Sequence, residues 1–118
     1  MVAGAHANRF FLDVARTDSV WTVGIGDNPV TLESNGVRVQ PMWSSRSRVE
    51  KIIANVKAYS NCTVLGIKWS EFERLWLDLL VKEGVLLGLN WSGAKANGYE
   101  MPARLVAESV RAARDAAA

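Results

Sequence analysis

The stretch from Val64 to Trp91 reads VLGIKWSEFERLWLDLLVKEGVLLGLNW. It predicts a strand over Thr63–Ile67, an amphipathic helix that begins near Ser70, and a second strand over Val85–Trp91. Almost no residue is left over between these elements, which indicates a tightly packed α+β domain. The second strand is mostly apolar, so we expect it in the centre of a sheet.

The helix of this unit carries its own start and stop signals. Ser70 and Glu73 have the spacing of a capping box, in which each side chain bonds to the backbone N–H of the other residue. Gly84 suits the C-terminal end, where a left-handed residue is common. An apolar stripe at helical spacing predicts the buried face, made by Phe72, Leu75, Trp76, Leu79 and Leu80.

The residues before this unit predict a helix, a three-stranded meander and a second helix. Asn35-Gly36 is a two-residue hairpin signal because both positions accept a positive φ. The second helix is expected after Ser44 or Ser45, either of which can cap it. The first helix is expected to end near Arg16 or Thr17, and the strands to cover Val20–Ile25, Val30–Glu33 and Val37–Gln40.

The C-terminal residues predict a loop over Ser92–Tyr99 and a last helix that starts near Pro102. The alanine-rich end, residues 112–118, is expected to fray. The predicted order is therefore α-β-β-β-α-β-α-β-α. It corresponds to an α+β fold in one domain over residues 1–118, with a mainly antiparallel sheet of about five strands and about four helices.

Charge and cysteine content narrow the function classes. The chain has 118 residues and a formal net charge of +2. This charge is too small to create a strong electrostatic attraction to nucleic acid or to a membrane surface. Cys62 is the one cysteine, which excludes an intrachain disulfide and fits a reducing compartment. No secretory signal or membrane-length apolar run is visible. We expect a cytoplasmic protein that binds neither a membrane nor nucleic acid directly.

Residues that commonly carry catalysis are scarce in this sequence. His6 is the only histidine, and we expect it to be a solvated residue of the first helix with no partner at metal-ligand spacing. Cys62 has no sequence neighbour that would lower the pKa of its thiol. Gly24-Ile25-Gly26 lacks the third glycine and the helix of a dinucleotide-binding turn. The expectation is a protein without enzymatic activity, metal or cofactor.

The segment Trp43-Ser44-Ser45-Arg46-Ser47-Arg48 is a candidate binding site. It combines the unpaired N–H groups of a helix start with serines and two arginines, which suit a phosphate or a carboxylate. The alternative interpretation is a capped helix with a solvated basic face. Trp43 and Trp91 each end a strand beside a serine, so they are candidates either for a shallow binding surface or for the core.

Several motifs match a known family pattern. They are Arg9-Phe10, Val20-Trp21, Pro41-Met42-Trp43-Ser44-Ser45, Trp69-Ser70-Glu71-Phe72, Leu75-Trp76-Leu77 and Leu89-Asn90-Trp91. On these residues the chain resembles the bacterial family called domain of unknown function 2750, over about residues 8–108. It departs from the pattern at Asp78, where the family often has proline, and in the basic second helix, where the family often has acidic residues.

The resemblance also implies a function. Small families of this kind are similar to immunity proteins, which neutralise a toxin delivered between bacteria, such as a type VI secretion effector with DNase activity. The expected mechanism is occlusion of the toxin's active site or substrate groove in a heterodimer. The alternative is a module that binds a small anion or phosphorylated ligand at Ser44–Arg48. Candidate contact residues are Trp43, Ser44, Ser45, Arg46, Arg48, Glu71, Asp78, Asn90, Trp91 and Tyr99.

Overall fold

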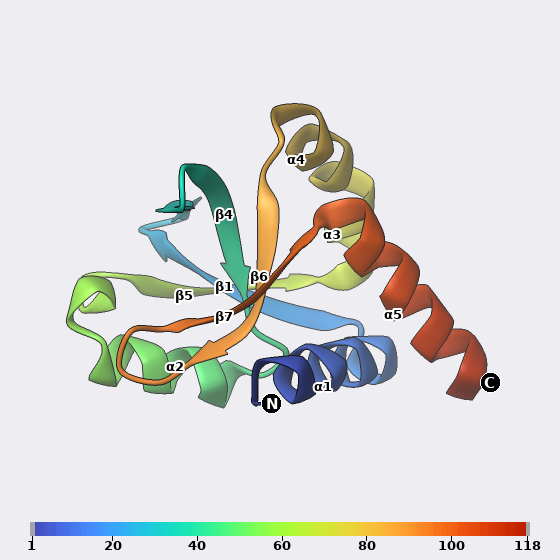
Figure 1. Cartoon of the computed structure of the whole chain (residues 1–118), viewed down its shortest axis with the longest axis horizontal. Helices are drawn as coiled ribbons and strands as arrows, with labels where there is room; N and C mark the ends of the chain where they lie inside the picture. Colours follow the sequence, from blue (N-terminus) through green and yellow to red (C-terminus); the bar gives the residue numbers. More distant parts are fainter. Residues whose placement is uncertain (1, 118) are drawn as a thin grey trace.

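Two β-sheets form the centre of the molecule in the computed structural model, which describes residues 2–117 (Figure 1). The first sheet has the strand order β2-β1-β5, with β1 Ser19–Ile25, β2 Asn28–Pro29 and β5 Thr63–Lys68. The second sheet has the order β3-β4-β6-β7, with β3 Leu32–Ser34, β4 Val37–Met42, β6 Leu86–Ser92 and β7 Asn97–Pro102. As predicted, β6 is an internal strand of its sheet.

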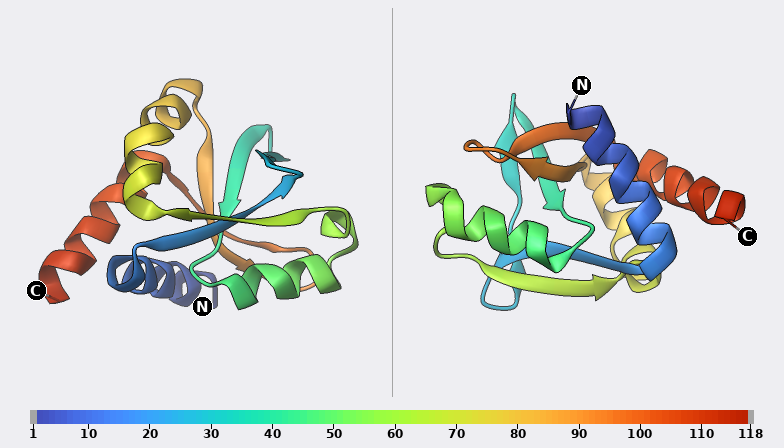
Figure 2. Two further views of the ribbon diagram at one scale, coloured as in Figure 1. Left: turned by 180° about the vertical axis from the view of Figure 1, so that it is seen from behind. Right: turned by 90° about the horizontal axis from the view of Figure 1, so that it is seen from below.

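Helices pack around both sheets. Figure 2 shows α1 alongside α5 at one end of the molecule and α2 beside the β1–β5 pair. The α5 helix continues through residues 112–117, where the sequence predicts fraying, and Ala118 lies outside the described residues. The helices are α1 Val2–Thr17, α2 Arg46–Asn55, α3 Trp69–Leu75, α4 Leu77–Glu83 and α5 Ala103–Ala117, with a short 3-10 helix, η1, at Lys57–Tyr59.

The predicted α+β class and mainly antiparallel pairing are confirmed, although the element counts differ. The β4–β6 pair is parallel, and the other strand pairs are antiparallel. The described residues contain seven strands and five α-helices. The surplus arises because β2 forms between the predicted strands Val20–Ile25 and Val30–Glu33, β7 begins inside the predicted loop and runs to Pro102, and the third predicted helix breaks into α3 and α4.

The predicted three-stranded meander is split between the two sheets. The hairpin signal is confirmed, because Asn35 and Gly36 have φ values of 53° and 80° and join β3 to β4. However, β1 pairs along its length with β5. Among the described residues, one isolated backbone bridge links β1 to the residue after β4, where Trp21 and Trp43 exchange N–H to carbonyl bonds of 2.8 and 2.9 Å. Side-chain bonds also link the sheets, because the Thr22 hydroxyl donates to the Pro41 carbonyl at 2.6 Å and accepts from Gln40 at 2.8 Å.

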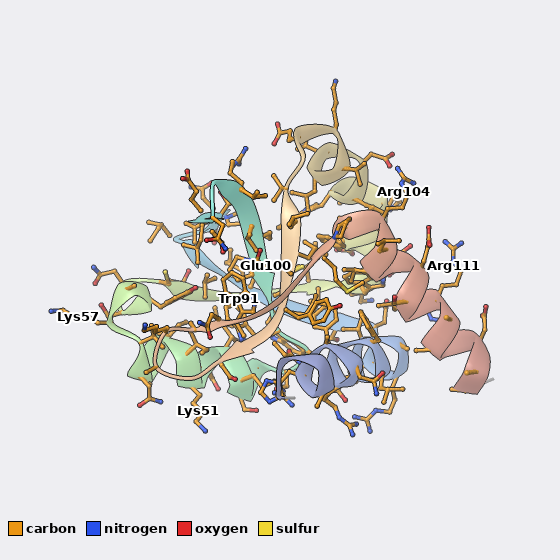
Figure 3. The ribbon with its side chains drawn as sticks, in the orientation of Figure 1. Lys51, Lys57, Trp91, Glu100, Arg104 and Arg111 are labelled. Atoms are coloured by element: carbon orange, nitrogen blue, oxygen red, sulfur yellow. The ribbon has the colours of Figure 1, made fainter. Side chains whose placement is uncertain are left out.

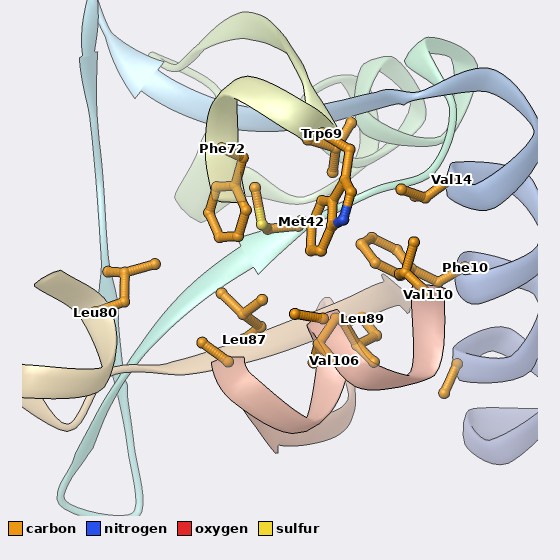
Figure 4. Close-up of a cluster of buried hydrophobic side chains, with 14 of the residues drawn as sticks. Phe10, Val14, Met42, Trp69, Phe72, Leu80, Leu87, Leu89, Val106 and Val110 are labelled. Carbon is orange, nitrogen blue, oxygen red and sulfur yellow. The ribbon is translucent and has the colours of Figure 1, made fainter. Parts of the chain in front are cut away.

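The larger hydrophobic core lies between the second sheet, α1, α3 and α5 (Figure 4). Trp69 is fully buried in it, with its ring stacked on Phe72 at a centroid distance of 4.7 Å and edge-on to Phe10 at 6.1 Å. A second core lies under α2 and contains Val23, Trp43, Ile52, Tyr59 and Trp91. Burial of apolar side chains in these two clusters fixes the helices on the sheets.

The third predicted helix breaks at Trp76, which ends α3 and precedes α4 with φ −115° and ψ −30°. Phe72 and Leu80 are buried, whereas Leu75 and Leu79 are 57% and 56% exposed. The predicted burial of these two leucines is therefore wrong. Gly84 ends α4 in a left-handed conformation with φ 69°, as predicted.

Asp18 supplies the side-chain cap of α3. The carboxylate of Asp18 accepts the Ser70 backbone N–H at 3.0 Å and the Ser70 hydroxyl at 2.9 Å. Lys68 occupies the N-cap position without a side-chain bond. The predicted Ser70–Glu73 capping box is wrong because α3 starts one residue before Ser70, which places Ser70 inside the first turn.

Replacing Asp18 with alanine is expected to lower the free energy of unfolding by about 1–2 kcal/mol, because the cap is lost and alanine must adopt a φ of 54°. Asp18→Asn keeps an acceptor and tolerates this φ, so most of the stability should remain. Glu73→Ala is the matched control and should change stability by less than about 0.5 kcal/mol. Urea unfolding followed by circular dichroism measures all three. Equal losses for Asp18→Ala and Glu73→Ala would contradict the assignment of the cap.

Candidate functional site

The helix start at Ser44–Arg48 forms as predicted, but its polar side chains are engaged within the protein. Ser45 is the N-cap of α2, and its Oγ accepts the Arg48 N–H at 3.3 Å. Ser44 is buried, and its hydroxyl donates to Asp13 at 2.8 Å. Arg46 forms an ion pair with Glu50 at 3.1 Å. The capped-helix interpretation therefore describes these serines and Arg46.

Trp43 and Trp91 are internal, so of the two interpretations open for them the structure supports the core. Trp43 is fully buried, and its Nε1 donates to the Trp91 carbonyl at 2.8 Å. The Trp91 Nε1 donates to the Tyr99 carbonyl at 3.1 Å. Gly88 allows this packing, because a Cβ at that position would overlap the Trp91 ring. Both indoles are held between the second sheet and α2, and an edge of Trp91 lines a pocket described below.

Asn90 is a structural residue at the junction of three elements. It is buried and has a left-handed φ of 50°. Its Oδ1 accepts the Ser44 N–H at 2.8 Å, and its Nδ2 donates to the Ser44 hydroxyl at 3.0 Å and to the His6 carbonyl at 3.2 Å. These bonds tie β6 to α1 and to the segment before α2. Asn90 therefore offers no side-chain surface to a partner.

The remaining predicted contact residues lie at the surface but do not form one site. Glu71 and Asp78 are exposed on α3 and α4, and Tyr99 is exposed on β7. Arg48 is half-buried on α2. Figure 1 places α2 at the lower edge of the molecule and α4 at the upper edge. The predicted contact residues therefore lie on separate surfaces of the protein. Two of these surfaces contain a hollow.

The first hollow lies where the two sheets diverge, and we call it the inter-sheet groove. It consists of two cavities of about 310 and 410 Å³ that share Pro29 and Trp76 as lining residues. Gln40 lies at its base and donates from Nε2 to the Thr22 hydroxyl at 2.8 Å and to the Val30 carbonyl at 3.0 Å. The groove is lined by Thr22, Asp27, Pro29, Thr31, Arg38, Gln40, Leu65, Gly66, Ile67, Glu71, Leu75, Trp76, Leu79, Leu80 and Glu83.

Apolar side chains and carboxylates dominate this groove. Leu75 and Leu79 are exposed and line the groove together with Trp76, on the wall that α3 and α4 form. Its charged lining residues are three carboxylates and one guanidinium, and the guanidinium of Arg38 pairs with Glu83 at 3.7 Å. The groove therefore combines an apolar wall with a net negative rim, although the whole chain is slightly basic.

The second hollow is a pocket of about 540 Å³ beside α2, which we call the α2 pocket. Its walls come from α2, from His6 of α1 and from the turn after β6, and Figure 3 shows Lys51 extending from α2 and Trp91 on β6. The imidazole Nδ1 of His6 lies 3.3 Å from the Ser92 hydroxyl. The pocket is lined by His6, Arg48, Lys51, Ile52, Asn55, Val56, Trp91, Ser92, Gly93 and Ala94.

The position of His6 in the α2 pocket is a feature that sequence reasoning missed. The sequence predicts a solvated residue of the first helix, whereas the side chain is half-buried against Ser92. The contact joins residues 86 positions apart, so neither periodicity nor motif spacing contains a signal for it. Arg48 and Trp91 are the predicted contact residues that this pocket brings together.

The surroundings of Cys62 do not activate its thiol. Burial raises the pKa of Cys62, which keeps the sulfur protonated at neutral pH. Burial, together with the neighbouring Cys62, also raises the pKa of the Tyr59 hydroxyl to about 12. Within residues 2–117, no three histidine, cysteine, aspartate or glutamate side chains gather as a metal site would require. The helices in this part of the chain also lack the length and apolar character of a membrane span.

These features define a small α+β protein whose two sheets are linked near Thr22 and Trp43 and border a groove. A comparison with family patterns identifies the family. The family described as "Protein of unknown function (DUF2750)" matches residues 7–110, and the chain belongs to this family. The resemblance predicted from residues 8–108 is thereby confirmed. No curated protein matches the chain.

Proposed function

We propose that this protein is a cytoplasmic immunity protein that binds and neutralises a cognate antibacterial toxin through the inter-sheet groove. The observation that carries the proposal is the exposed pair Leu75 and Leu79 beside Trp76. More than half of each leucine side chain faces solvent. Apolar side chains gathered at a hollow on the surface are typical of a protein-binding site.

The charges around the groove favour a basic partner. Asp27, Glu71 and Glu83 line it against the single guanidinium of Arg38, and Asp78 is exposed in the first turn of α4. A toxin that cleaves nucleic acid needs a basic groove to hold phosphates. An acidic rim complements such a groove and accelerates association with it. We therefore propose a nuclease, delivered by a type VI secretion system, as the class of toxin.

The proposed mechanism is occlusion and requires no chemistry from this chain. A stable interface of standard size buries about 1,600 Å² in total. The leucines and Trp76 would fill its water-excluded centre, where most binding energy arises, and the carboxylates would form its rim. Binding in this way covers the substrate groove of the toxin and prevents nucleic acid from entering.

The partner is identified by affinity purification of the tagged full-length chain from its own host, followed by mass spectrometry. We expect one stoichiometric protein that survives a high-salt wash, is toxic when expressed alone and is harmless when co-expressed with this chain. Failure to protect cells against any co-purified protein would overturn the proposal.

Changing Leu75 and Leu79 together to serine is expected to weaken toxin binding by about 100-fold or more, because the apolar anchors of the interface are removed. The fold should be kept, since both side chains are already largely exposed. Leu105→Ser is the matched control, because Leu105 is 47% exposed on α5 and does not line the groove. Titration calorimetry of each variant against the purified toxin gives the affinities. An unchanged affinity for the double variant would exclude the groove as the contact surface.

A further inference from the structure

The α2 pocket differs from the inter-sheet groove in position and in charge. Figure 1 shows α2 and the β6–β7 turn at the lower edge of the molecule, and α4 and the β3–β4 hairpin at the upper edge. The two hollows share no lining residue. The lining of the α2 pocket contains two cationic side chains, Arg48 and Lys51, together with the imidazole of His6, and it contains no carboxylate.

The positive charges of this pocket are not balanced within the described protein. Arg9, Arg16, Arg38, Arg46 and Arg114 form ion pairs. In residues 2–117 no carboxylate oxygen pairs within 4.0 Å with Arg48 or Lys51. Two arginines of α2 differ in this respect. Arg46 forms an ion pair with Glu50, whereas Arg48, two residues later, lines the pocket. An anion in the pocket would give both side chains a partner of opposite charge.

The geometry of α2 holds the two cations together. Arg48 and Lys51 are three positions apart, so they lie on the same face of the helix and repel each other when no anion is present. The Arg48 backbone is fixed by its bond to the Ser45 cap, and the Lys51 carbonyl accepts the Asn55 amide at 2.8 Å. His6 approaches from α1, on another wall of the same pocket. Three residues with nitrogen-bearing side chains therefore line one pocket from two elements.

The other side of the pocket is apolar and contains a fixed aromatic ring. Ile52, Val56 and Ala94 line it together with Trp91. The Trp91 indole is held by its bond to the Tyr99 carbonyl and by its close packing on Gly88. A volume of about 540 Å³ lies within the range of pockets that enclose small organic molecules, roughly 300–1,000 Å³.

We propose that the α2 pocket binds a small phosphate monoester that carries a planar ring, a chemistry found in nucleoside monophosphates. Arg48 and Lys51 hold the phosphate, with Arg48 able to make two parallel bonds to its oxygens. His6 donates a further hydrogen bond from its second ring nitrogen. The planar ring packs against Trp91 and the aliphatic side chains of Ile52 and Val56. This site does not depend on toxin binding at the groove.

Titration calorimetry on the full chain at low salt tests the ligand class with adenosine monophosphate, phenyl phosphate, inorganic phosphate and adenosine. We expect both monoesters to bind, inorganic phosphate to bind at least 10-fold more weakly, and adenosine to give no measurable heat. Equal affinity for inorganic phosphate and the monoesters would overturn the role of the planar ring. Absence of monoester binding at millimolar concentration, or binding of an oligonucleotide alone, would overturn the site as proposed.

Two substitutions in α2 test the residues of the pocket. Arg48→Gln and Lys51→Gln are each expected to weaken binding of adenosine monophosphate by at least 10-fold, while thermal unfolding confirms that both variants fold. Arg46→Gln is the matched control, because it removes a positive charge from the same helix outside the pocket lining. An equal loss of affinity in Arg46→Gln would show that general charge, and not this pocket, attracts the anion.

Discussion

Replacing Trp69 with alanine is expected to lower the free energy of unfolding by about 3–5 kcal/mol. The side chain is fully buried and contacts Phe72 and Phe10 through its ring, so its removal leaves a large cavity between α1 and α3. Domains of this size are typically stable by about 5–15 kcal/mol, so the variant would lose a large share of its stability. Urea unfolding monitored by far-ultraviolet circular dichroism measures the loss.

A second substitution at the same position separates packing from hydrogen bonding. The Trp69 Nε1 is buried and has no hydrogen-bond partner among the described residues. Trp69→Phe removes this unsatisfied donor while it keeps an aromatic ring, so the two effects partly cancel. We expect a loss below about 2 kcal/mol, clearly smaller than for alanine. Equal losses for phenylalanine and alanine would contradict this account of the core.

Replacing Asn90 with alanine is expected to cost about 3 kcal/mol of stability. The buried Ser44 N–H loses its acceptor, which alone costs about 1–3 kcal/mol, and alanine is strained at a φ of 50°. Asn90→Gly relieves the strain without restoring the bonds, so it should be more stable than Asn90→Ala by about 1 kcal/mol. Thermal and urea unfolding measure both variants.

The Asn90 variants also distinguish two interpretations of this residue. The sequence suggests a contact with a partner, whereas the structure places the side chain inside the protein, bonded to Ser44 and His6. A partner contact would leave the stability of Asn90→Ala unchanged and affect binding alone. That result would contradict the structural role, which rests on the three hydrogen bonds of the amide.

The features that were predicted correctly are those marked by a local sequence signal, such as a turn dipeptide, a glycine at a helix end or an apolar repeat. The Asn35-Gly36 turn and the Gly84 helix end were identified because few residues adopt a positive φ without strain. The first helix was identified because its apolar positions repeat at helical spacing, and β6 because a continuous apolar strand belongs inside a sheet. Each of these signals lies within one short segment of the chain.

The features that sequence reasoning missed depend on contacts between distant segments. The strand β7 carries mostly exposed, polar residues and is defined by its hydrogen bonds to β6, so no apolar alternation indicates it. The break at Trp76 was missed because the apolar stripe continues through it without proline or glycine. The strand β1 pairs mainly with β5 instead of with β3 or β4, and no local sequence pattern indicates this pairing.

The same limit applies to the candidate sites. Residue types suggested Trp43 and Asn90 as contacts, yet tertiary packing buries both. Arg48 was suggested by its charge at a helix start, and it lines the α2 pocket, another wall of which comes from His6 and from the turn after β6. Leu75 and Leu79 were predicted to be buried because they continue the apolar stripe, but neither packs into the core.

The parallel pairing of β4 with β6 also determines the order in which the chain can mature on the ribosome. These neighbouring strands are separated in sequence by α2, β5, α3 and α4. Until β6 leaves the exit tunnel, Met42 and Trp43 of the finished N-terminal half have no central strand to cover them, and the Trp43 indole has no Trp91 carbonyl to bond. The nascent protein therefore lacks these contacts while the residues between Trp43 and Trp91 are being synthesised, and contacts so far apart in the chain form slowly.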